Sequence, residues 1–471
     1  MRSHCSILVL ITALLSTGGS PSRGGSPVDV HLQIPSQLKI PPGSHYFIDQ
    51  NGQPFFWLGD TGWLLFTKLN REETERYLED RRSKGFNVIQ VMVLHSLDDV
   101  NAYGDSALVN HNVATPHTTE GNNISVAGQY DYWDHIDYVI DRAAAKGIWI
   151  ALVPVWGSIV KSGHVTEPAA ARYAAFLALR FKAKPNIIWM NGGDIKGSDS
   201  INVWNRIGAT LHAGDPAHLV TFHPRGRASS STWFHGQAWL NFNSVQSGHR
   251  SYAQDTSKGD PHYGEDNWKY IQADYNRSPV KPVLDAEPSY EGIPHGLHDT
   301  LQPRWTAADI RRYGYWSVFA GAAGYTYGNN SVMQMLKPAD KGSAYGAKAY
   351  WYDAINDPGA AQVQYLKKLL LSRPYVDRVP DPSLVADAGL QYNYVAATRG
   401  KDYAFIYTYT GRNFKLVMGR IGGTQVKAAW FNPRSGTTTP AGAYANKGIV
   451  EFNPPGDPQN GNDWVLVLDS R

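Results

Sequence analysis

Two acidic segments that each end an apolar run contain the residues best suited to chemistry. The first, NIIWMNGGD, ends at Asp194, and the second, VKPVLDAE, ends at Glu287. In a barrel of parallel strands, side chains at the carboxyl ends converge on one mouth, so carboxylates from two distant strands can flank one bond. Paired carboxylates in a cleft rich in aromatic residues are typical of glycosidic bond hydrolysis.

The residues around each carboxylate favour separate roles. Two glycines precede Asp194 and leave room for a ligand to approach the backbone. A proton donor needs a raised pKa, which an apolar wall or the charge of Glu287 could supply. Pro288 biases Glu287 toward the extended conformation of a strand end. Two structural alternatives stay open: Asp194 could cap the following helix, and Glu287 could pair with Arg225 or Arg311.

Further candidates lie at the ends of predicted strands. Asp285 is two residues before Glu287 and points the same way, so it is the rival nucleophile. Asp60 could accept hydrogen bonds from sugar hydroxyls or form an Asx turn with Gly62. The remaining candidates for substrate binding are Trp63, Trp156, Asn191, His223, Gln246 and Tyr327. Each has a structural alternative, either core packing of the aromatic ring or support of a loop backbone.

The elements that must position these side chains alternate between short apolar runs and amphipathic stretches. Strands are expected over 55–60, 88–94, 148–156, 187–190, 219–222, 242–246, 280–284 and 324–327. Helices are expected over 71–84, 132–146, 169–181, 203–212, 267–275 and 307–319. Eight such units predict a (β/α)8 TIM barrel over residues 36–373. A doubly wound sheet gives the same alternation, but no Gly-rich phosphate turn follows the first strand.

Residues 374–471 have a different sequence pattern, with short alternating strands, turn signals and no long helix. This pattern predicts a small C-terminal all-β sandwich domain with a core of its own. We expect it to contribute no catalytic group. Ending the chain near Arg373 should then leave cleavage of a small soluble substrate intact, provided that the barrel stays folded.

Residues 1–20 have the features of a secretory signal peptide: Arg2, the apolar run Ile7–Leu15 and then small residues. Residues 21–35, rich in Ser, Gly and Pro, are expected to be a disordered tether. The only cysteine, Cys5, would leave with the signal peptide. These features predict a secreted protein, extracellular or periplasmic, and no other apolar stretch approaches the ~20 residues of a membrane span.

Composition and motifs bound the remaining function classes. The chain has 44 basic and 41 acidic residues among 471, so nothing indicates nucleic acid binding. It lacks the H-E-x-x-H, G-x-S-x-G and G-x-x-x-x-G-K motifs, so no metal or cofactor is expected. The loop 95–117 contains His and Asp residues and is expected to be solvated, with a surface metal site as the alternative. The sequence does not set the oligomeric state.

Four motifs in order resemble the apiosidase-like catalytic domain of glycoside hydrolase family 140: WLGDTGW at 57–63, GFNVIQ at 85–90, WMNGGD at 189–194 and EPSYEG at 287–292. The segment WFNPRSG at 430–436 resembles the collagen-binding-type β-domain that follows it in that family. The resemblance implies a TIM-barrel retaining hydrolase of apiosyl linkages in the branched pectin rhamnogalacturonan II. It places the acid/base on Asp194 and the nucleophile on Glu287.

Two other functions stay open. A retaining hydrolase of another β-linked glycan would keep the mechanism, because fold does not set substrate. A non-catalytic protein that binds polysaccharide or matrix is the second alternative, and the presence of both carboxylates argues against it.

Overall fold

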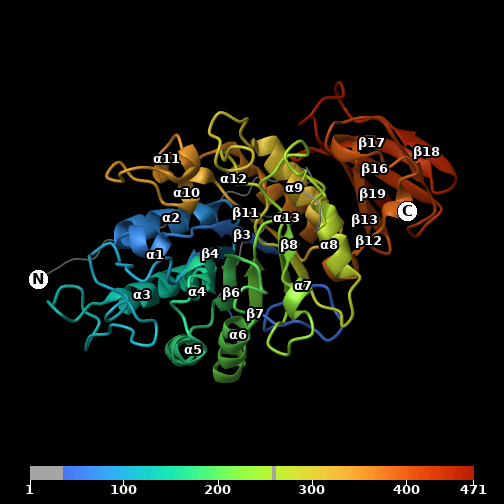
Figure 1. The fold of residues 1–471 in the computed structure, drawn as a ribbon. Coiled ribbons are helices and arrows are strands. Elements are labelled where there is room, and N and C mark those ends of the chain that lie inside the picture. The colour runs from blue at the N-terminus through green and yellow to red at the C-terminus, as the bar shows by residue number, and fades with distance from the viewer. Residues whose placement is uncertain (1–35, 257–260) are drawn as a thin grey trace, which may run out of the picture. The chain divides into compact units, whose positions relative to one another are not determined.

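The computed structural model describes residues 36–256 and 261–471 (Figure 1). The predicted signal peptide and tether, with Cys5, lie outside the described residues. Eight parallel strands form a barrel-like sheet: β3 (Trp57–Thr61), β4 (Val88–Met92), β5 (Trp149–Val153), β6 (Ile187–Ile195), β7 (Val220–Pro224), β9 (Asn243–Gln246), β10 (Val283–Asp285) and β11 (Gly324–Tyr327). They run in the order β7-β6-β5-β4-β3-β11-β10-β9, and β8 (Ala228–Ser229) pairs antiparallel with β9. The predicted (β/α)8 fold is confirmed.

The barrel is closed between β7 and β9 by bonds from the segment that precedes β9. The backbone N–H of Asn241 donates to the carbonyl of Val220 at 2.8 Å. The amide oxygen of Asn241 accepts the N–H of Val220 at 2.6 Å. The hydroxyl of Thr221 donates to the carbonyl of Phe242 at 2.7 Å. These bonds join the amino ends of β7 and β9, so the two strands lie side by side in the barrel.

Helices α2 (Arg71–Ser83), α3 (Tyr132–Ala145), α5 (Glu167–Phe181), α6 (Ile201–Gly214), α8 (Trp268–Tyr275) and α9 (Ala307–Phe319) connect the strands. Their ends follow local sequence. Asn70 and Asp131 each form a capping box with the acidic residue three positions on. Gly85 and Gly147 follow α2 and α3 with φ of 81° and 73°, values that favour glycine. The predicted helices therefore begin and end within two residues of their expected positions.

The shorter elements of the first 377 residues are β1 (Phe47–Ile48), β2 (Pro54–Phe55), α1 (Leu65–Lys68), α4 (Gly157–Lys161), α7 (Ser231–Phe234), α10 (Asn330–Met333), η1 (Ala344–Gly346), α11 (Trp351–Ala354), α12 (Pro358–Gln362), α13 (Gln364–Leu371) and η2 (Tyr375–Asp377). In the part of the chain that the structure describes, no helix is long and apolar enough to cross a membrane.

The C-terminal region consists of two antiparallel sheets with a hydrophobic core between them. One sheet has the order β12-β13-β14-β19-β16-β17 and the other pairs β15 with β18. Their bounds are β12 (Val379–Pro380), η3 (Pro382–Leu384), η4 (Gln391–Asn393), β13 (Val395–Arg399), β14 (Tyr403–Thr408), β15 (Phe414–Val417), β16 (Gln425–Phe431), β17 (Thr438–Ala445), β18 (Ile449–Phe452) and β19 (Trp464–Ser470). The predicted all-β domain is confirmed.

The larger of these sheets is buried on both faces. Along β14, Ala404 and Ile406 belong to the core of the C-terminal region, whereas Phe405 and Tyr407 belong to the core that includes the barrel. This is the alternation expected of a strand, in which successive side chains point to opposite faces. The ring of Tyr407 stacks on Tyr315 of α9, with centroids 4.6 Å apart. The whole of α9 from Ile310 onward is consequently buried.

Buried ion pairs accompany this packing. Nη2 of Arg311 lies 2.8 Å from Oδ1 of Asp463, and the two side chains are 5% and 0% exposed. Nε of Arg373 lies 2.6 Å from Oδ1 of Asp469 in a half-buried pair. Because α9 packs directly on the six-stranded sheet, one face of that sheet belongs to a hydrophobic core that includes the barrel, and the other face belongs to the separate core of the C-terminal region.

Candidate active site

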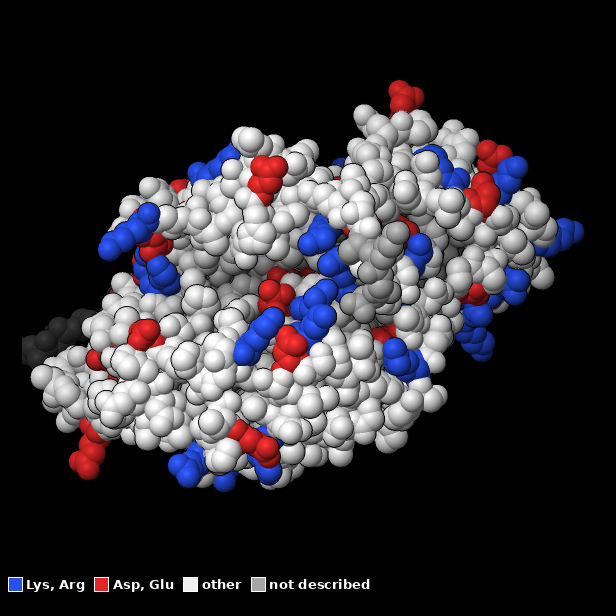
Figure 2. Space-filling model, viewed as in Figure 1, with Lys and Arg blue, Asp and Glu red and all other residues white. Residues whose placement is uncertain are grey.

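A cavity of about 600 Å³ lies at the carboxyl ends of the barrel strands, within the usual size range of ligand sites. Figure 2 shows it as a hollow in the surface, with acidic side chains inside and basic side chains beside it. The structure brings five of the predicted site residues to its lining: Trp63, Trp156, Asp194, Gln246 and Glu287. They come from loops and strand ends far apart in the sequence.

Asp194 is turned into the cavity by an irregularity near the end of β6. The register with β7 shifts between Gly192 and Ile195. Gly192 and Gly193 have φ of 89° and 121°, and a Cβ added at Gly193 would lie 2.5 Å from the ring of Trp156. Asp194 itself has a φ of 46° although it is not a glycine. Such a conformation costs about 1–3 kcal/mol and is typical of functional sites.

Two histidines hold the carboxylate of Glu287. Nε2 of His249 lies 3.1 Å from Oε1, and Nε2 of His223 lies 3.0 Å from Oε2. Nδ1 of His223 accepts the backbone N–H of Asp194 at 3.3 Å. Because that nitrogen is an acceptor, the proton of a neutral ring lies on Nε2, where it faces Glu287. His223 therefore connects the backbone of one carboxylate residue to the side chain of the other.

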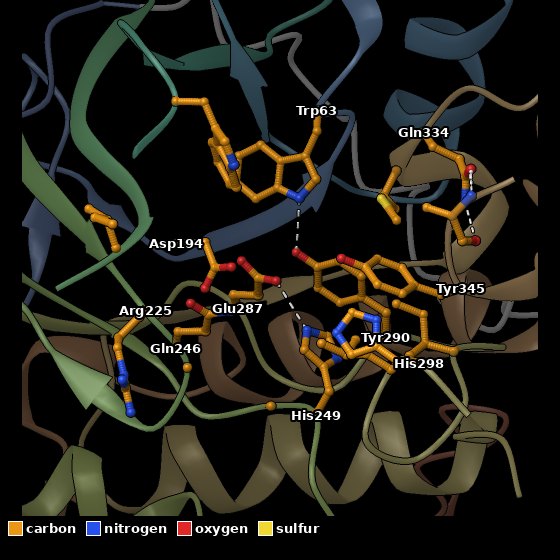
Figure 3. Close-up of a pocket in the computed structure, with 18 of the residues that line it drawn as sticks. Trp63, Asp194, Arg225, Gln246, His249, Glu287, Tyr290, His298, Gln334 and Tyr345 are labelled. Carbon is orange, nitrogen blue, oxygen red and sulfur yellow. Dashed lines mark hydrogen bonds and ion pairs between the residues drawn. The ribbon is translucent and has the colours of Figure 1, made fainter. Parts of the chain in front are cut away.

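The two carboxyl groups face each other (Figure 3), and their surroundings separate their pKa values. Loss of surrounding water raises the pKa of Asp194 to about 6, and the negative charge of Glu287 contributes, although Asp194 remains accessible from the cavity. Burial alone would raise the pKa of Glu287, but bonds from His223 and His249 outweigh it and lower that pKa to about 2. Between these values one group is a proton donor and the other an ionised nucleophile.

Aromatic rings form a wall next to the carboxylates. The centroids of Trp63 and Trp156 are 5.8 Å apart with an interplanar angle of 56°. Nε1 of Trp63 donates to the hydroxyl of Tyr290 at 3.1 Å, as Figure 3 shows. Both indole rings line the cavity, so they can stack against the apolar face of a sugar ring.

Three predicted substrate-binding residues are buried away from the cavity. Asp60 accepts the hydroxyl of Tyr77 at 2.7 Å, and Nε of Arg81 lies 3.2 Å from its Oδ2, so it forms a core ion pair. Asn191 donates to the carbonyl of Trp204 at 2.8 Å and supports α6. Tyr327 donates to Glu291 at 2.7 Å. His223, the remaining candidate, is also buried and acts on Glu287 from behind.

The structure also shows the surroundings of the residues for which the sequence left alternatives open. Asp285 is fully buried and accepts bonds from Ser247, Ser317 and Asn267, so it braces the barrel interior outside the cavity lining. Burial raises its pKa to about 6. The residue at the N-cap of α6 is Ser200, so Asp194 does not cap that helix. Arg311 pairs with Asp463, and Glu287 is held by histidines.

Sequence reasoning missed several residues that line the cavity: Lys161, Lys196, Arg227, His249, Arg250, Tyr290, His298 and Tyr345. For two of these residues, the distance from the end of a strand could have indicated a place at the cavity. Arg227 lies three residues after β7 and Arg250 four residues after β9, where loops open onto the barrel mouth. Tyr290 lies within the EPSYEG motif but carries no pattern that marks it as a site residue. His298 and Tyr345 lie in irregular segments whose course depends on tertiary contacts.

Within the described residues, no group of three or more His, Cys, Asp or Glu side chains is placed to hold a metal ion. In the loop 95–117, the carboxylate of Asp99 accepts the backbone N–H groups of His95 and Ser96 at 2.6 and 3.0 Å. That carboxylate therefore organises its own loop.

Comparison with known proteins agrees with this geometry. The family model of the apiosidase-like catalytic domain matches residues 41–377, and a model for the collagen-binding domain of a collagenase matches residues 379–469. A solved structure described as a glycoside hydrolase is 45% identical, with a TM-score of 0.87, covering 92% of this chain and 97% of that one. A structure described as a family 5 glycoside hydrolase from Bacteroides vulgatus is 42% identical, with a TM-score of 0.87, covering 92% and 94%. No curated protein matches the chain.

Proposed function

Because the chain belongs to the apiosidase-like family of glycoside hydrolases, we propose that it cleaves apiosyl linkages of the pectin rhamnogalacturonan II by a two-carboxylate retaining mechanism. The observation that carries the mechanism is the placement of Asp194 and Glu287 in the lining of one cavity, with the carboxylate of Glu287 held by His249 and His223. This environment favours a pKa of about 6 for Asp194 and of about 2 for Glu287. A donor and an ionised nucleophile coexist between these values.

In the first step, a carboxylate oxygen of Glu287 attacks the anomeric carbon. The bond from that carbon to the leaving oxygen breaks, and the proton of Asp194 passes to the leaving oxygen. His223 and His249 keep Glu287 ionised until it attacks. The product is an ester between the sugar and Glu287.

In the second step, Asp194 acts as a base. It takes a proton from water, the water oxygen attacks the anomeric carbon, and the ester bond to Glu287 breaks. Esterification has already removed the negative charge of Glu287, which contributes to the raised pKa of Asp194. The ionised form of Asp194 is therefore favoured at the stage that needs it. Two displacements at one carbon retain the anomeric configuration.

The basic residues beside the cavity support an acidic glycan as substrate. Lys161 and Arg227 line it but are paired with Asp199 and Asp255. The side chains of three further cations in the lining, Lys196, Arg225 and Arg250, form no bond or ion pair with another described residue. Free cations at a cavity attract carboxylates, and pectin chains carry carboxylates on their sugars.

Incubation with purified rhamnogalacturonan II oligosaccharides tests this function. We expect free apiose among the products, with its initial anomeric form by proton NMR matching the linkage that was cleaved. Neutral β-linked glycans serve as the comparison. Release of another sugar from such a glycan, with none from the pectin fragments, would keep the mechanism and overturn the substrate.

We also propose that the protein acts outside the cytoplasm, as the segment 1–20 suggests. N-terminal sequencing of the protein recovered from the medium or periplasm of its host tests this. A chain retained in the cytoplasm with an intact N-terminus would contradict it.

A further inference from the structure

One wall of the cavity is formed by the short segment Ala344–Gly346, whose central residue has an unusual backbone. Tyr345 has a φ of 52° and a ψ of 31°. This left-handed region is uncommon for bulky side chains. The conformation costs about 1–3 kcal/mol and persists only where the surroundings impose it. The contacts around this segment show what imposes it.

Two side chains from α10 and its C-terminal end hold the first half of the segment. The amide of Gln334 bonds twice to the backbone of Ala344: Nε2 donates to the carbonyl at 3.1 Å, and Oε1 accepts the N–H at 2.8 Å. Nδ2 of Asn330 donates to the carbonyl of Tyr345 at 3.0 Å. Gln334 and Asn330 are themselves buried. The peptide groups on both sides of the Tyr345 Cα are thus fixed.

A third side chain holds the second half and connects it to the loop that contains Glu287. The guanidinium of Arg304 donates to the carbonyl of Gly346 at 2.8 Å and to the carbonyl of Gly292 at 2.5 Å. Gly292 lies five residues after Glu287 in the loop that follows β10. Three successive residues are therefore anchored by three different side chains. These bonds fix the backbone around Tyr345 and therefore the direction in which its side chain points.

The phenol of Tyr345 points into the cavity toward the two carboxylates (Figure 3). Burial raises its pKa, and the charges of Glu287 and Asp194 raise it further, so the hydroxyl keeps its proton. Its ring centroid lies 5.6 Å from that of His298. The hydroxyl of Tyr290 is bonded to Trp63, whereas that of Tyr345 has no hydrogen-bond partner among the described residues.

We propose that Tyr345 is a substrate-binding residue that determines specificity, and that its hydroxyl donates a hydrogen bond to a hydroxyl of the sugar held beside Asp194 and Glu287. The proposal rests on the glycoside hydrolase function of this cavity. The strained backbone is maintained because it aims a proton donor at the one part of the cavity where the sugar must lie.

The first test replaces the hydroxyl alone. On the 4-nitrophenyl glycoside that the wild type cleaves fastest in a panel that includes the apioside, Tyr345→Phe should lower kcat/KM about 3- to 10-fold, the usual effect of one lost hydrogen bond. One deoxy form of that glycoside should lack the hydroxyl that Tyr345 binds. The wild type should cleave it with a kcat/KM lower by the same factor, and Tyr345→Phe should show no further loss of kcat/KM on it. Tyr350→Phe, in an exposed tyrosine of the same region, is the matched control and should be neutral.

The second test separates binding from a structural role. Asn tolerates the left-handed region, so Tyr345→Asn should keep or raise the melting temperature while it lowers kcat/KM. A lower melting temperature together with an unchanged kcat/KM would overturn the proposal. So would a Tyr345→Phe substitution that lowers kcat/KM by the same factor on every deoxy analogue. Cleavage of a glycoside other than the apioside would instead overturn the proposed substrate, and the Tyr345 comparison would be made on that glycoside.

Discussion

The pKa values of Asp194 and Glu287 predict the pH dependence of kcat/KM. With values of about 6 and about 2, the form with Asp194 protonated and Glu287 ionised is about 98% of the free enzyme at pH 4, about 9% at pH 7 and about 1% at pH 8. On a glycoside with a poor leaving group, kcat/KM should therefore fall about tenfold per pH unit above pH 6.

The fall of kcat/KM at high pH, the alkaline limb, depends on Asp194, and its fall at low pH, the acidic limb, depends on Glu287. Two substitutions should change these limbs separately. Asp194→Asn, measured on a nitrophenyl glycoside that needs little protonation, should lose the alkaline limb. His249→Phe removes the 3.1 Å bond to Glu287, so the pKa of Glu287 should rise from about 2 toward its ordinary value of 4.5, and the acidic limb should move up with it.

The assay is the initial rate at substrate concentrations well below KM between pH 3 and pH 8, with circular dichroism at each pH to confirm that the protein is folded. An alkaline limb that persists in Asp194→Asn would show that another group is the proton donor. An acidic limb that stays in place in His249→Phe would show that the histidine does not control Glu287.

Three further predictions concern the backbone, the stability and the domain contact. Gly193→Ala would place a Cβ 2.5 Å from the ring of Trp156 at a φ of 121°, so it should displace Asp194 and lower kcat/KM about 100-fold or more. Gly236→Ala, with open space around it, is the control and should be neutral; equal kcat/KM values for the two variants would contradict this prediction. Because the pKa of Asp194 is raised to about 6, ionisation of this residue destabilises the folded state as the pH rises from about 4 to about 6. The melting temperature of Asp194→Asn should therefore exceed that of the wild type at pH 7 and equal it at pH 4, and a difference that does not change with pH would contradict the raised pKa. Arg311→Met leaves the buried Asp463 without its cationic partner and should lower the unfolding free energy by about 3–5 kcal/mol in urea titrations. Ending the chain at Arg373 removes the residues that cover Tyr315 and Phe319 of α9, so the barrel should be unstable, and the condition under which a truncated chain was expected to keep its activity is not met. A soluble, fully active truncated chain would contradict this.

Much of the barrel could be predicted because hydrophobic periodicity is local. Strand β6 was an exception, since it extends to Ile195 through two glycines that a strand pattern does not favour. The burial of α9 could not be foreseen either. Arg311 and Arg312 indicate a solvated face by their type, yet both are buried, because the sheet that covers α9 comes from residues more than 70 positions later.

The site was predictable where a side chain ends a strand and unpredictable where a loop carries it. Asp194 and Glu287 end apolar runs, so their convergence followed from the barrel alone. Asp60 also ends a strand, but Arg81 from α2 pairs with it in the core, and the sequence does not show how that helix is rotated. Tyr345 has its position only through side chains that are distant in the sequence or follow no periodic pattern.

Azide rescue tests the assignment of both carboxylates most directly. Asp194→Gly should cleave a 4-nitrophenyl glycoside into an accumulating ester on Glu287, and azide should restore turnover by attacking that ester in place of base-activated water. We expect a glycosyl azide with the anomeric configuration of the substrate, and no rescue of this kind for Glu287→Gly. A glycosyl azide of inverted configuration from Asp194→Gly, or one of retained configuration from Glu287→Gly, would contradict it.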